Sequence, residues 1–122
     1  MNRGEANTAD VDALVSAYVA AAAAHGRATE KGDYEAANQQ HEILAAAYRE
    51  LRERGLEAQR ALLPLLSGEL PVRVWVAAHA LEFAPEVGEQ VLVGVASGPA
   101  GPSRMDAEMT LREWRRGTLR FP

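Results

Sequence analysis

The chain has 122 residues, of which 48% are hydrophobic, and a formal net charge of −4 at pH 7. This length favours one domain with a modest core, and the negative charge disfavours a general binder of nucleic acids or anionic membranes. The absence of cysteine excludes disulfides, thiolate metal ligands and a cysteine nucleophile, and it agrees with a reducing cytoplasm.

The sequence carries no pattern typical of export or membrane insertion. Residues 1–5 lack the apolar core of a signal peptide, and the apolar run 11–24 is too short to cross a bilayer. One lysine accompanies twelve arginines, a bias typical of genes from GC-rich bacteria. We therefore expect a bacterial cytoplasmic protein without membrane contact.

A first helix is predicted after a short polar segment. Residues 1–9 are polar and small, so we expect a flexible N-terminus, with Thr8 or Asp10 as the cap of the helix. Apolar residues then recur in steps of three and four, which places them on one helical face. The predicted inward face consists of Val11, Leu14, Tyr18, Ala21 and His25.

A second helix follows a glycine turn. Gly32 interrupts the periodic pattern, Asp33 can cap the next helix, and Gly55 ends it in the manner of a C-cap. The same steps of three and four continue through the segment, so the two helices should form an antiparallel hairpin. The predicted inward face consists of Tyr34, Ala37, His41, Leu44, Tyr48 and Leu51.

The second half predicts shorter helices separated by proline and glycine. The valine-rich runs 72–76 and 91–95 could be strands, but both continue without turn residues into helical sequence, so we favour helices. We first predict a leucine-rich helix at 56–66 that Pro64 kinks or ends, followed by a break at 67–71. A buried apolar helix at 72–83 and a helix at 86–96, with Pro85 at its first position, come next. The rest of the chain is predicted to form a loop at 97–102, a last helix from Ser103 or Asp106 to Gly117, and a C-terminal tail at 118–122.

Two stretches thirty residues apart resemble each other. Residues 61–68 and 91–98 are apolar and both end in Ser-Gly. The same offset aligns Ala77 with Ala107 and Leu81 with Leu111. Each copy reads as an apolar helix, a turn and a second helix, which is typical of a helical solenoid unit.

The first copy resembles a HEAT repeat. Leu-Leu-Pro-Leu-Leu at 62–66 is followed by Val72-Arg73 and by Ala-Ala-His-Ala-Leu at 77–81. In that family a leucine-proline-leucine helix precedes a turn and an alanine-rich helix that begins with Val-Arg, although Ser67-Gly68 replaces the usual aspartate here. The resemblance implies an all-α fold of the α-α superhelix type, in which residues 10–117 form a single helical domain with the N-terminal hairpin packed on about two HEAT-like helix pairs.

Residues 11–117 as a whole resemble a small bacterial family known only as a domain of unknown function (number two thousand and nineteen). The shared features are a long N-terminal hairpin, the stretch 60–65, a Val-Arg helix, Ala84-Pro85-Glu86 and the Met-Thr-Leu-Arg at 109–112. The resemblance implies the same fold, and it brings no established activity, cofactor or catalytic residue.

No catalytic motif is complete in this sequence. His41-Glu42 begins like the helical zinc-protease motif, but Ala45 stands where the second histidine belongs. The glycine-rich run 94–101 does not follow phosphate-loop spacing, and prolines remove amide donors from it. No serine lies in a nucleophile elbow or at a recognisable spacing from a histidine. We therefore expect no catalytic residue, no bound metal and no cofactor.

His25 and His41 are the one pair that could form a small site. They lie seven residues before and nine residues after Gly32, so their heights along the hairpin differ by about 3 Å, and we expect them to approach each other. Such a pair could bind a metal or respond to pH. We favour ordinary packing residues, because two neutral ligands without a certain carboxylate make a poor metal site.

Three sets of residues are candidates for an interaction surface. Residues from 104 onward carry a net charge of +2 and the remainder carries −6, so the ends of the chain differ in sign. For the aromatic pair we favour core packing, and for the arginines a solvated helix end. The candidates are the acidic residues Glu35, Glu42 and Glu50, the aromatic pair Trp75 and His79, and the arginine end, which is Arg112, Arg115, Arg116 and Arg120.

These observations favour a non-enzymatic protein-interaction module, for example a small accessory or immunity-type protein that binds a basic partner. The expected partner is another protein, and a homo-oligomer is left open. The alternative is an enzyme-like site that binds a metal or small ligand around His25 and His41. Weak binding of nucleic acid or phosphate through the C-terminal arginines ranks third.

Overall fold

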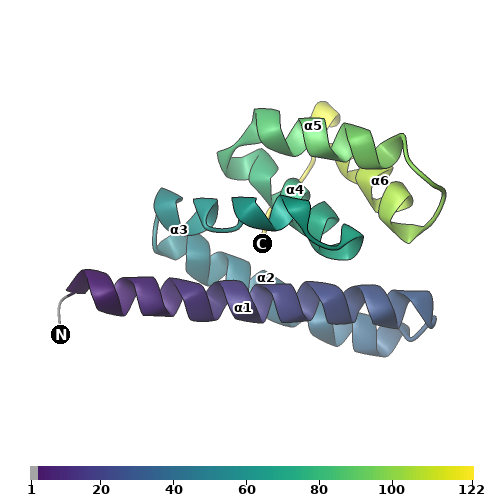
Figure 1. The fold of residues 1–122 in the computed structure, drawn as a ribbon. Helices are drawn as coiled ribbons and strands as arrows, with labels where there is room; N and C mark the ends of the chain where they lie inside the picture. The colour runs from purple at the N-terminus through teal and green to yellow at the C-terminus, as the bar shows by residue number, and fades with distance from the viewer. Residues whose placement is uncertain (1–2) are drawn as a thin grey trace. The chain divides into compact units, whose positions relative to one another are not determined.

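A computed structural model describes the backbone from Arg3 to Pro122 and the side chains from Asp10 onward. This part of the chain is helical and contains no strand, so the predicted all-α class and the helical interpretation of 72–76 and 91–95 are confirmed (Figure 1). The elements are α1 (Arg3–Glu30), α2 (Tyr34–Glu53), α3 (Leu56–Arg60), the short 3-10 helix η1 (Leu63–Ser67), α4 (Leu70–Phe83), α5 (Pro85–Ala96) and α6 (Pro102–Arg116).

The chain forms two compact units, and the range 10–117 that is predicted as one domain includes parts of both. The first unit ends at Leu62, and the second runs from Leu63 to Phe121. The first therefore holds α1, α2 and α3, and the second holds η1, α4, α5 and α6.

Helix α1 begins at Arg3, so the predicted start near Thr8 or Asp10 is wrong. Residues 5–9 contain neither glycine nor proline and include two alanines, so nothing in this stretch stops a helix. Residues 1–2 lie outside the described residues, and the flexibility expected of 1–9 stays a prediction.

Helices α1 and α2 lie side by side as an antiparallel hairpin, as predicted (Figure 1). Gly32 turns the chain with φ +73°, a left-handed conformation that glycine adopts without a steric penalty. Asp33 then caps α2, because its Oδ1 accepts a hydrogen bond of 3.1 Å from the backbone N–H of Ala36. The turn chemistry read from the sequence is therefore confirmed.

The core of the first unit follows most of the predicted faces. Two predictions are wrong, because Tyr34 is 71% exposed and His41 is also exposed. Both lie on the turn side of Leu44, and Tyr34 is the first residue of α2 at the end of the hairpin. The buried residues of this unit are Tyr18, Ala21, Ala22, Ala28, Ala37, Leu44, Ala45, Ala47, Tyr48, Leu51, Ala58, Gln59 and Leu62.

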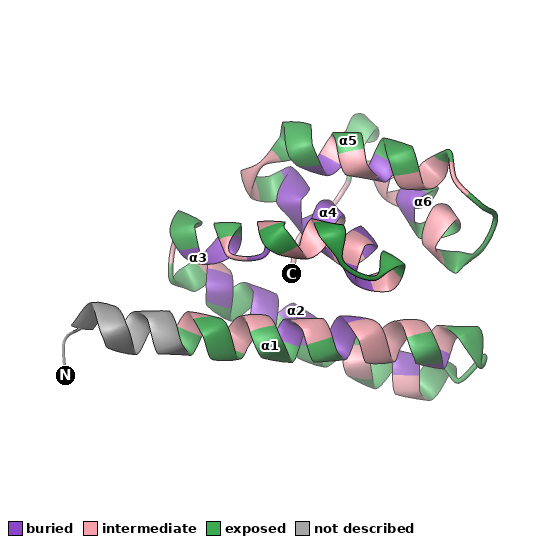
Figure 2. Cartoon of the chain, viewed as in Figure 1, coloured by how far each residue is buried: buried purple, intermediate pink, exposed green. Residues whose placement is uncertain are grey.

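In the second unit, α4, α5 and α6 pack around a common apolar core. Helix α4 carries more buried residues than α5 or α6, which confirms the prediction that 72–83 is a buried helix (Figure 2). Gly88 lets α5 approach α4 closely, since a Cβ at this position would lie 2.6 Å from the carbonyl oxygen of Ala77. The core consists of Val74, Ala77, Leu81, Leu92, Ala107 and Leu111.

Proline and glycine set the helix boundaries of the second unit. Pro64 breaks the predicted helix 56–66 into α3 and η1, because proline lacks the backbone N–H that an α-helix requires. Helix α4 starts at Leu70 with Pro71 in its first turn, so the break is shorter than the predicted 67–71. Helix α6 starts at Pro102, so the observed loop 97–101 is one residue shorter than predicted.

The end of α6 agrees with the sequence. The predicted end of the last helix at Gly117 is confirmed, and Gly117 adopts φ +74° as a left-handed cap. Residues 118–122 form no helix, yet Leu119 and Phe121 are partly buried against the core of the second unit.

Residues aligned by the thirty-residue offset lie together in the core of the second unit, but the two copies differ in secondary structure. Ala77, Leu81 and the residues aligned with them, Ala107 and Leu111, all belong to the core of the second unit. The first copy, however, opens with the five-residue 3-10 helix η1, whereas the second opens with the α-helix α5. The apolar helix expected at the start of the first copy is therefore a 3-10 helix, since Pro64 lacks the backbone N–H that an α-helix requires.

Candidate functional site

The acidic candidates all lie on the exposed side of α2. Glu35, Glu42 and Glu50 are exposed, whereas Leu44 and Tyr48 on the same helix are fully buried. Glu35 and Glu42 are seven residues apart, which places them on nearly the same side of a helix. We call Glu35, Glu42 and Glu50 the acidic face of α2.

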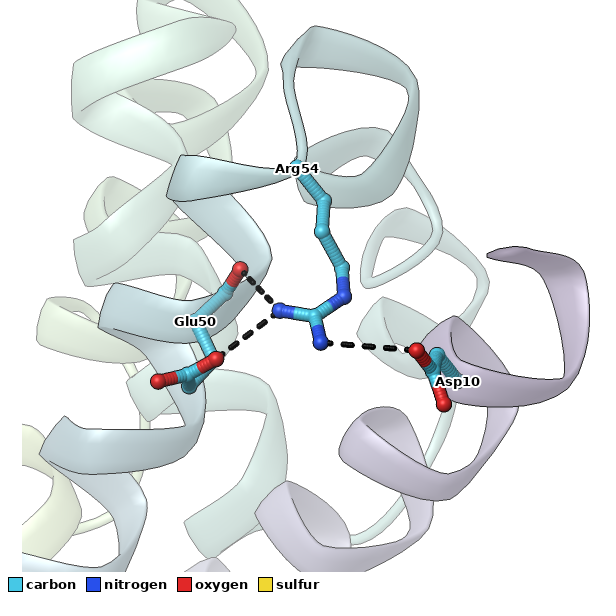
Figure 3. Close-up of polar contacts among 3 residues, drawn as sticks. All are labelled: Asp10, Glu50 and Arg54. Atoms are coloured by element: carbon cyan, nitrogen blue, oxygen red, sulfur yellow. Dashed lines mark hydrogen bonds and ion pairs between the residues drawn. The ribbon is translucent and has the colours of Figure 1, made fainter. Parts of the chain in front are cut away.

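Arg54 balances one of these three charges (Figure 3). Its Nη1 donates to the carboxylate of Glu50 at 2.9 Å and to the carbonyl oxygen of Glu50 at 3.1 Å. Its Nη2 lies 3.5 Å from Oδ2 of Asp10, so the guanidinium bridges α1 and the end of α2. The hydrogen bond that Arg54 donates to the Glu50 carboxylate is the main reason that the pKa of Arg54 is raised.

The Arg54 bridge was not anticipated from the sequence, although the i, i+4 spacing of Glu50 and Arg54 is its signal. All three side chains are substantially exposed, so solvent screens the bridge and it adds little to stability. Because of this bridge, Glu50 of the acidic face is paired with a cation. Within the described residues, Glu35 and Glu42 form no salt bridge.

A buried polar cluster joins the three helices of the first unit. Tyr18 on α1 and Tyr48 on α2 are fully buried, and Gln59 on α3 is 7% exposed. The Nε2 of Gln59 donates a 3.0 Å hydrogen bond to Oη of Tyr48. Burial, with a smaller contribution from Tyr48, raises the pKa of Tyr18 well above its usual value of 10.0. This cluster is closed to solvent, and its hydrogen bond connects α3 to α2.

The two histidines of the hairpin differ in exposure. His25 is half-buried and its carbonyl oxygen accepts a 2.9 Å hydrogen bond from the Thr29 hydroxyl, whereas His41 is exposed. Among the residues whose side chains are described, no group of three or more histidine, aspartate and glutamate residues could hold a metal ion. The approach of the two imidazoles stays a prediction.

Trp75 and His79 form an aromatic contact along α4. Their ring centroids are 6.0 Å apart and their planes are tilted by 30°. His79 is only 4% exposed and Trp75 is half-buried. A partner could therefore reach part of the Trp75 indole but not His79 in this conformation.

The arginine end lies at the C-terminus of α6 and beyond it. Arg112, Arg115, Arg116 and Arg120 are all exposed, and cations are favourable near the C-terminus of a helix. Arg115 forms a salt bridge with Glu89 on α5, in which its Nη2 lies 3.6 Å from Oε2.

The exposed methionines of α6 were not predicted from the sequence. Met105 is 61% exposed and Met109 is 54% exposed, one helical turn apart. Their signal was the phase of the helix, because Ala107 and Leu111 mark the inward side and a residue two positions away points elsewhere.

These features define a small all-helical protein that presents charged and apolar side chains on packed helices. Residues 12–114 match the family described as "Domain of unknown function (DUF2019)", and the chain belongs to this family. The resemblance to this family predicted from the sequence is thus confirmed. No curated protein shows significant sequence similarity to the chain.

A solved structure shares the fold. The crystal structure of the protein RPA1889 from Rhodopseudomonas palustris CGA009 is similar with a TM-score of 0.84 and 24% sequence identity, over 92% of this chain and 93% of that chain. None of the helices in the described residues is long and apolar enough to span a membrane.

Proposed function

We propose that this protein is a non-enzymatic protein-interaction module that encounters a basic partner through the acidic face of α2. The observation that carries the proposal is the exposure of Glu35 and Glu42 on the outward side of a helix, without a salt bridge in the described part of the chain. The first 62 residues hold seven lysines and arginines against ten aspartates and glutamates, so this half carries a charge of −3.

Exposed charges of one sign act mainly on the rate of encounter. Complementary potentials steer two proteins together and raise the association rate constant, while apolar contacts hold the complex afterwards. The half-buried Trp75 is a candidate aromatic anchor for that second step. The acidic face would then determine how fast the partner arrives, and apolar contacts how long it stays.

The proposal extends to the setting of the protein. A compact acidic helical fold suits an accessory or immunity-type protein in the bacterial cytoplasm, where it would neutralise a basic partner. The HEAT-like character of the second unit is part of this proposal, and the shared core positions Ala77, Leu81, Ala107 and Leu111 support it. No observation favours the alternative site at His25 and His41, of which the first is half-buried and the second exposed.

The test begins with the partner. Tagged protein captures binding proteins from its host lysate, each is identified by quantitative mass spectrometry, and the purified partner is measured by biolayer interferometry. We expect a basic partner whose association rate constant falls about threefold to tenfold with E35Q/E42Q, because electrostatic steering acts on this rate. The dissociation rate constant should change little.

A matched variant distinguishes the local face from the total charge. E69Q/E86Q removes the same amount of negative charge from exposed positions of the second unit, and it should slow association less. If replacing Arg112, Arg115 and Arg116 by alanine abolishes binding while E35Q/E42Q has no effect, the acidic-face proposal is wrong. Capture of acidic partners alone would also contradict it.

A further inference from the structure

Helix α6 has an exposed side whose residues do not contribute to the core of the second unit. Its inward side carries Ala107 and Leu111, which are buried in the core of the second unit. The opposite side carries four exposed residues at steps of four, three and four, which follow one another along a single line on a helix. We call these residues, Met105, Met109, Arg112 and Arg116, the Met-Arg stripe.

The stripe keeps its positive charge, while its neighbours are paired. Arg104 and Glu108 form a salt bridge of 2.9 Å, and Arg115 is paired with Glu89 at 3.6 Å. Across the described residues, neither Arg112 nor Arg116 takes part in a salt bridge. The stripe therefore offers two thioethers at one end and two unneutralised guanidinium groups at the other.

This combination has a definite binding chemistry. Methionine side chains are flexible and polarizable, so they adapt to apolar groups of varied shape. Guanidinium groups bind carboxylates through paired hydrogen bonds. We propose that the Met-Arg stripe is a docking surface for an acidic amphipathic helical segment of another protein, whose apolar side chains cover Met105 and Met109 and whose carboxylates pair with Arg112 and Arg116.

Length and charge define the segment further. Met105 and Arg116 are eleven residues apart, which corresponds to about 16 Å along the helix and to about three turns of a bound helix. A nucleic acid would meet the two arginines but would leave the methionines uncovered, and the net charge of −4 would repel it. A second copy presenting the same stripe would bring no carboxylate of its own to the arginines.

The stripe lies in the second unit and the acidic face of α2 lies in the first, so this inference stands independently of the proposed function. The two also require partners of opposite charge. Failure of one can therefore be recognised without failure of the other.

The first experiment selects the ligand from a displayed library of random 16-residue peptides on the full chain. We expect enriched peptides to be acidic and to repeat apolar residues at spacings of three and four. M105Q/M109Q and R112Q/R116Q should each weaken the binding of the best peptide at least about tenfold, equivalent to about 1.4 kcal/mol. The matched controls I43Q and R49Q/R60Q alter exposed residues of the first unit and should leave binding unchanged.

A spectroscopic experiment locates the bound peptide. The chain has three methionines, so labelling their methyl groups with carbon-13 yields few NMR signals. The signals of Met105 and Met109 should shift when the selected peptide is added, and single substitutions assign them. No enrichment, enrichment of basic peptides, or unchanged signals would overturn the proposal. Binding of a 15-nucleotide single strand with no acidic peptide selected, or signals that shift with protein concentration alone, would replace it by a nucleic-acid or self-association surface.

Discussion

At the scale of single residues, two glycines of the same helix are expected to behave in opposite ways. A Cβ on Gly88 would lie 2.6 Å from the carbonyl oxygen of Ala77 and 3.0 Å from the amide nitrogen of Leu81. Both atoms belong to the backbone of α4, which cannot move aside without shifting the helix. Gly94, in contrast, has nothing within 4 Å of its would-be Cβ.

We therefore predict that G88A lowers the free energy of unfolding by about 1–3 kcal/mol, as overpacking does in other cores. G94A should raise it by about 0.5–1 kcal/mol, because alanine is the better helix former at an unobstructed position. Urea unfolding of both variants, followed by circular dichroism, measures the two changes. Equal effects would show that α4 and α5 do not approach as closely as described.

The hydrogen bond between Tyr48 and Gln59 can be isolated by a double-mutant cycle. Y48F removes the oxygen that accepts from the buried Gln59 amide, and we expect a loss of about 1–3 kcal/mol in stability because a buried donor is left unsatisfied. The double variant Y48F/Q59L should cost clearly less than the sum of its single variants. Chemical denaturation of the four proteins measures the coupling, and additive costs would contradict it.

Burial of Tyr18 predicts a loss of stability at high pH. The folded protein holds the phenol proton more tightly than the unfolded chain, because burial raises the pKa of Tyr18 above 10.0. The stabilisation is complete below that value and declines as pH rises above it, by about 1.4 kcal/mol per pH unit. Y18F should remove this part of the decline. The comparison is the free energy of unfolding of both proteins from pH 9 to pH 11.5, and parallel curves would contradict the prediction.

At the scale of elements, the segment 118–121 belongs to the packing of the second unit although it forms no helix. Leu119 and Phe121 pack against the core cluster, to which Trp114 also contributes. Gly117 makes this possible, because its left-handed conformation ends α6 and turns the chain.

We predict that F121A destabilises the second unit by about 1–2 kcal/mol, which is part of the value for a fully buried phenylalanine. Tryptophan fluorescence follows this unit selectively, since both tryptophans, Trp75 and Trp114, lie within it. R120A, which alters the exposed residue between the two apolar ones, should change stability by less than about 0.5 kcal/mol. An F121A variant as stable as the unchanged protein would show that the segment does not pack.

At the scale of the whole molecule, the distribution of charge is the property most relevant to binding. The acidic face of α2 and the Met-Arg stripe carry opposite signs, in a chain whose net charge is −4. Capture of a basic partner should therefore depend on salt. Between about 0.01 M and 0.1 M ionic strength the screening length falls from about 30 Å to about 10 Å, and we expect the association rate constant to fall severalfold while the dissociation rate constant changes little. A rate constant independent of salt would exclude steering by the acidic face.

The helices and their local signals were readable in the sequence. Repeats of three and four predicted the hairpin, Gly32 and Asp33 predicted its turn, and Pro64, Pro85 and Gly117 predicted where helices break, begin and end. These features depend on backbone conformations and hydrogen bonds within a few residues, so the sequence alone contains the information.

The candidate surfaces could be predicted from the sequence only in part. The glutamates of α2 and the arginines of α6 were identified from charge and helical phase, and the structure exposes them. The exposure of Tyr34 and His41, the burial of Gln59 and the outward position of the α6 methionines were not anticipated.

Tertiary structure decided these points because exposure depends on which other segment covers a helical face. Tyr34 is exposed at the end of the hairpin, and α3 brings Gln59 to Tyr48 from eleven residues away. The need for glycine at position 88 likewise depends on the close approach of α4, which the sequence does not show. The sequence by itself determined where helices form and turn, whereas packing between distant residues determined which side chains remain available to a partner.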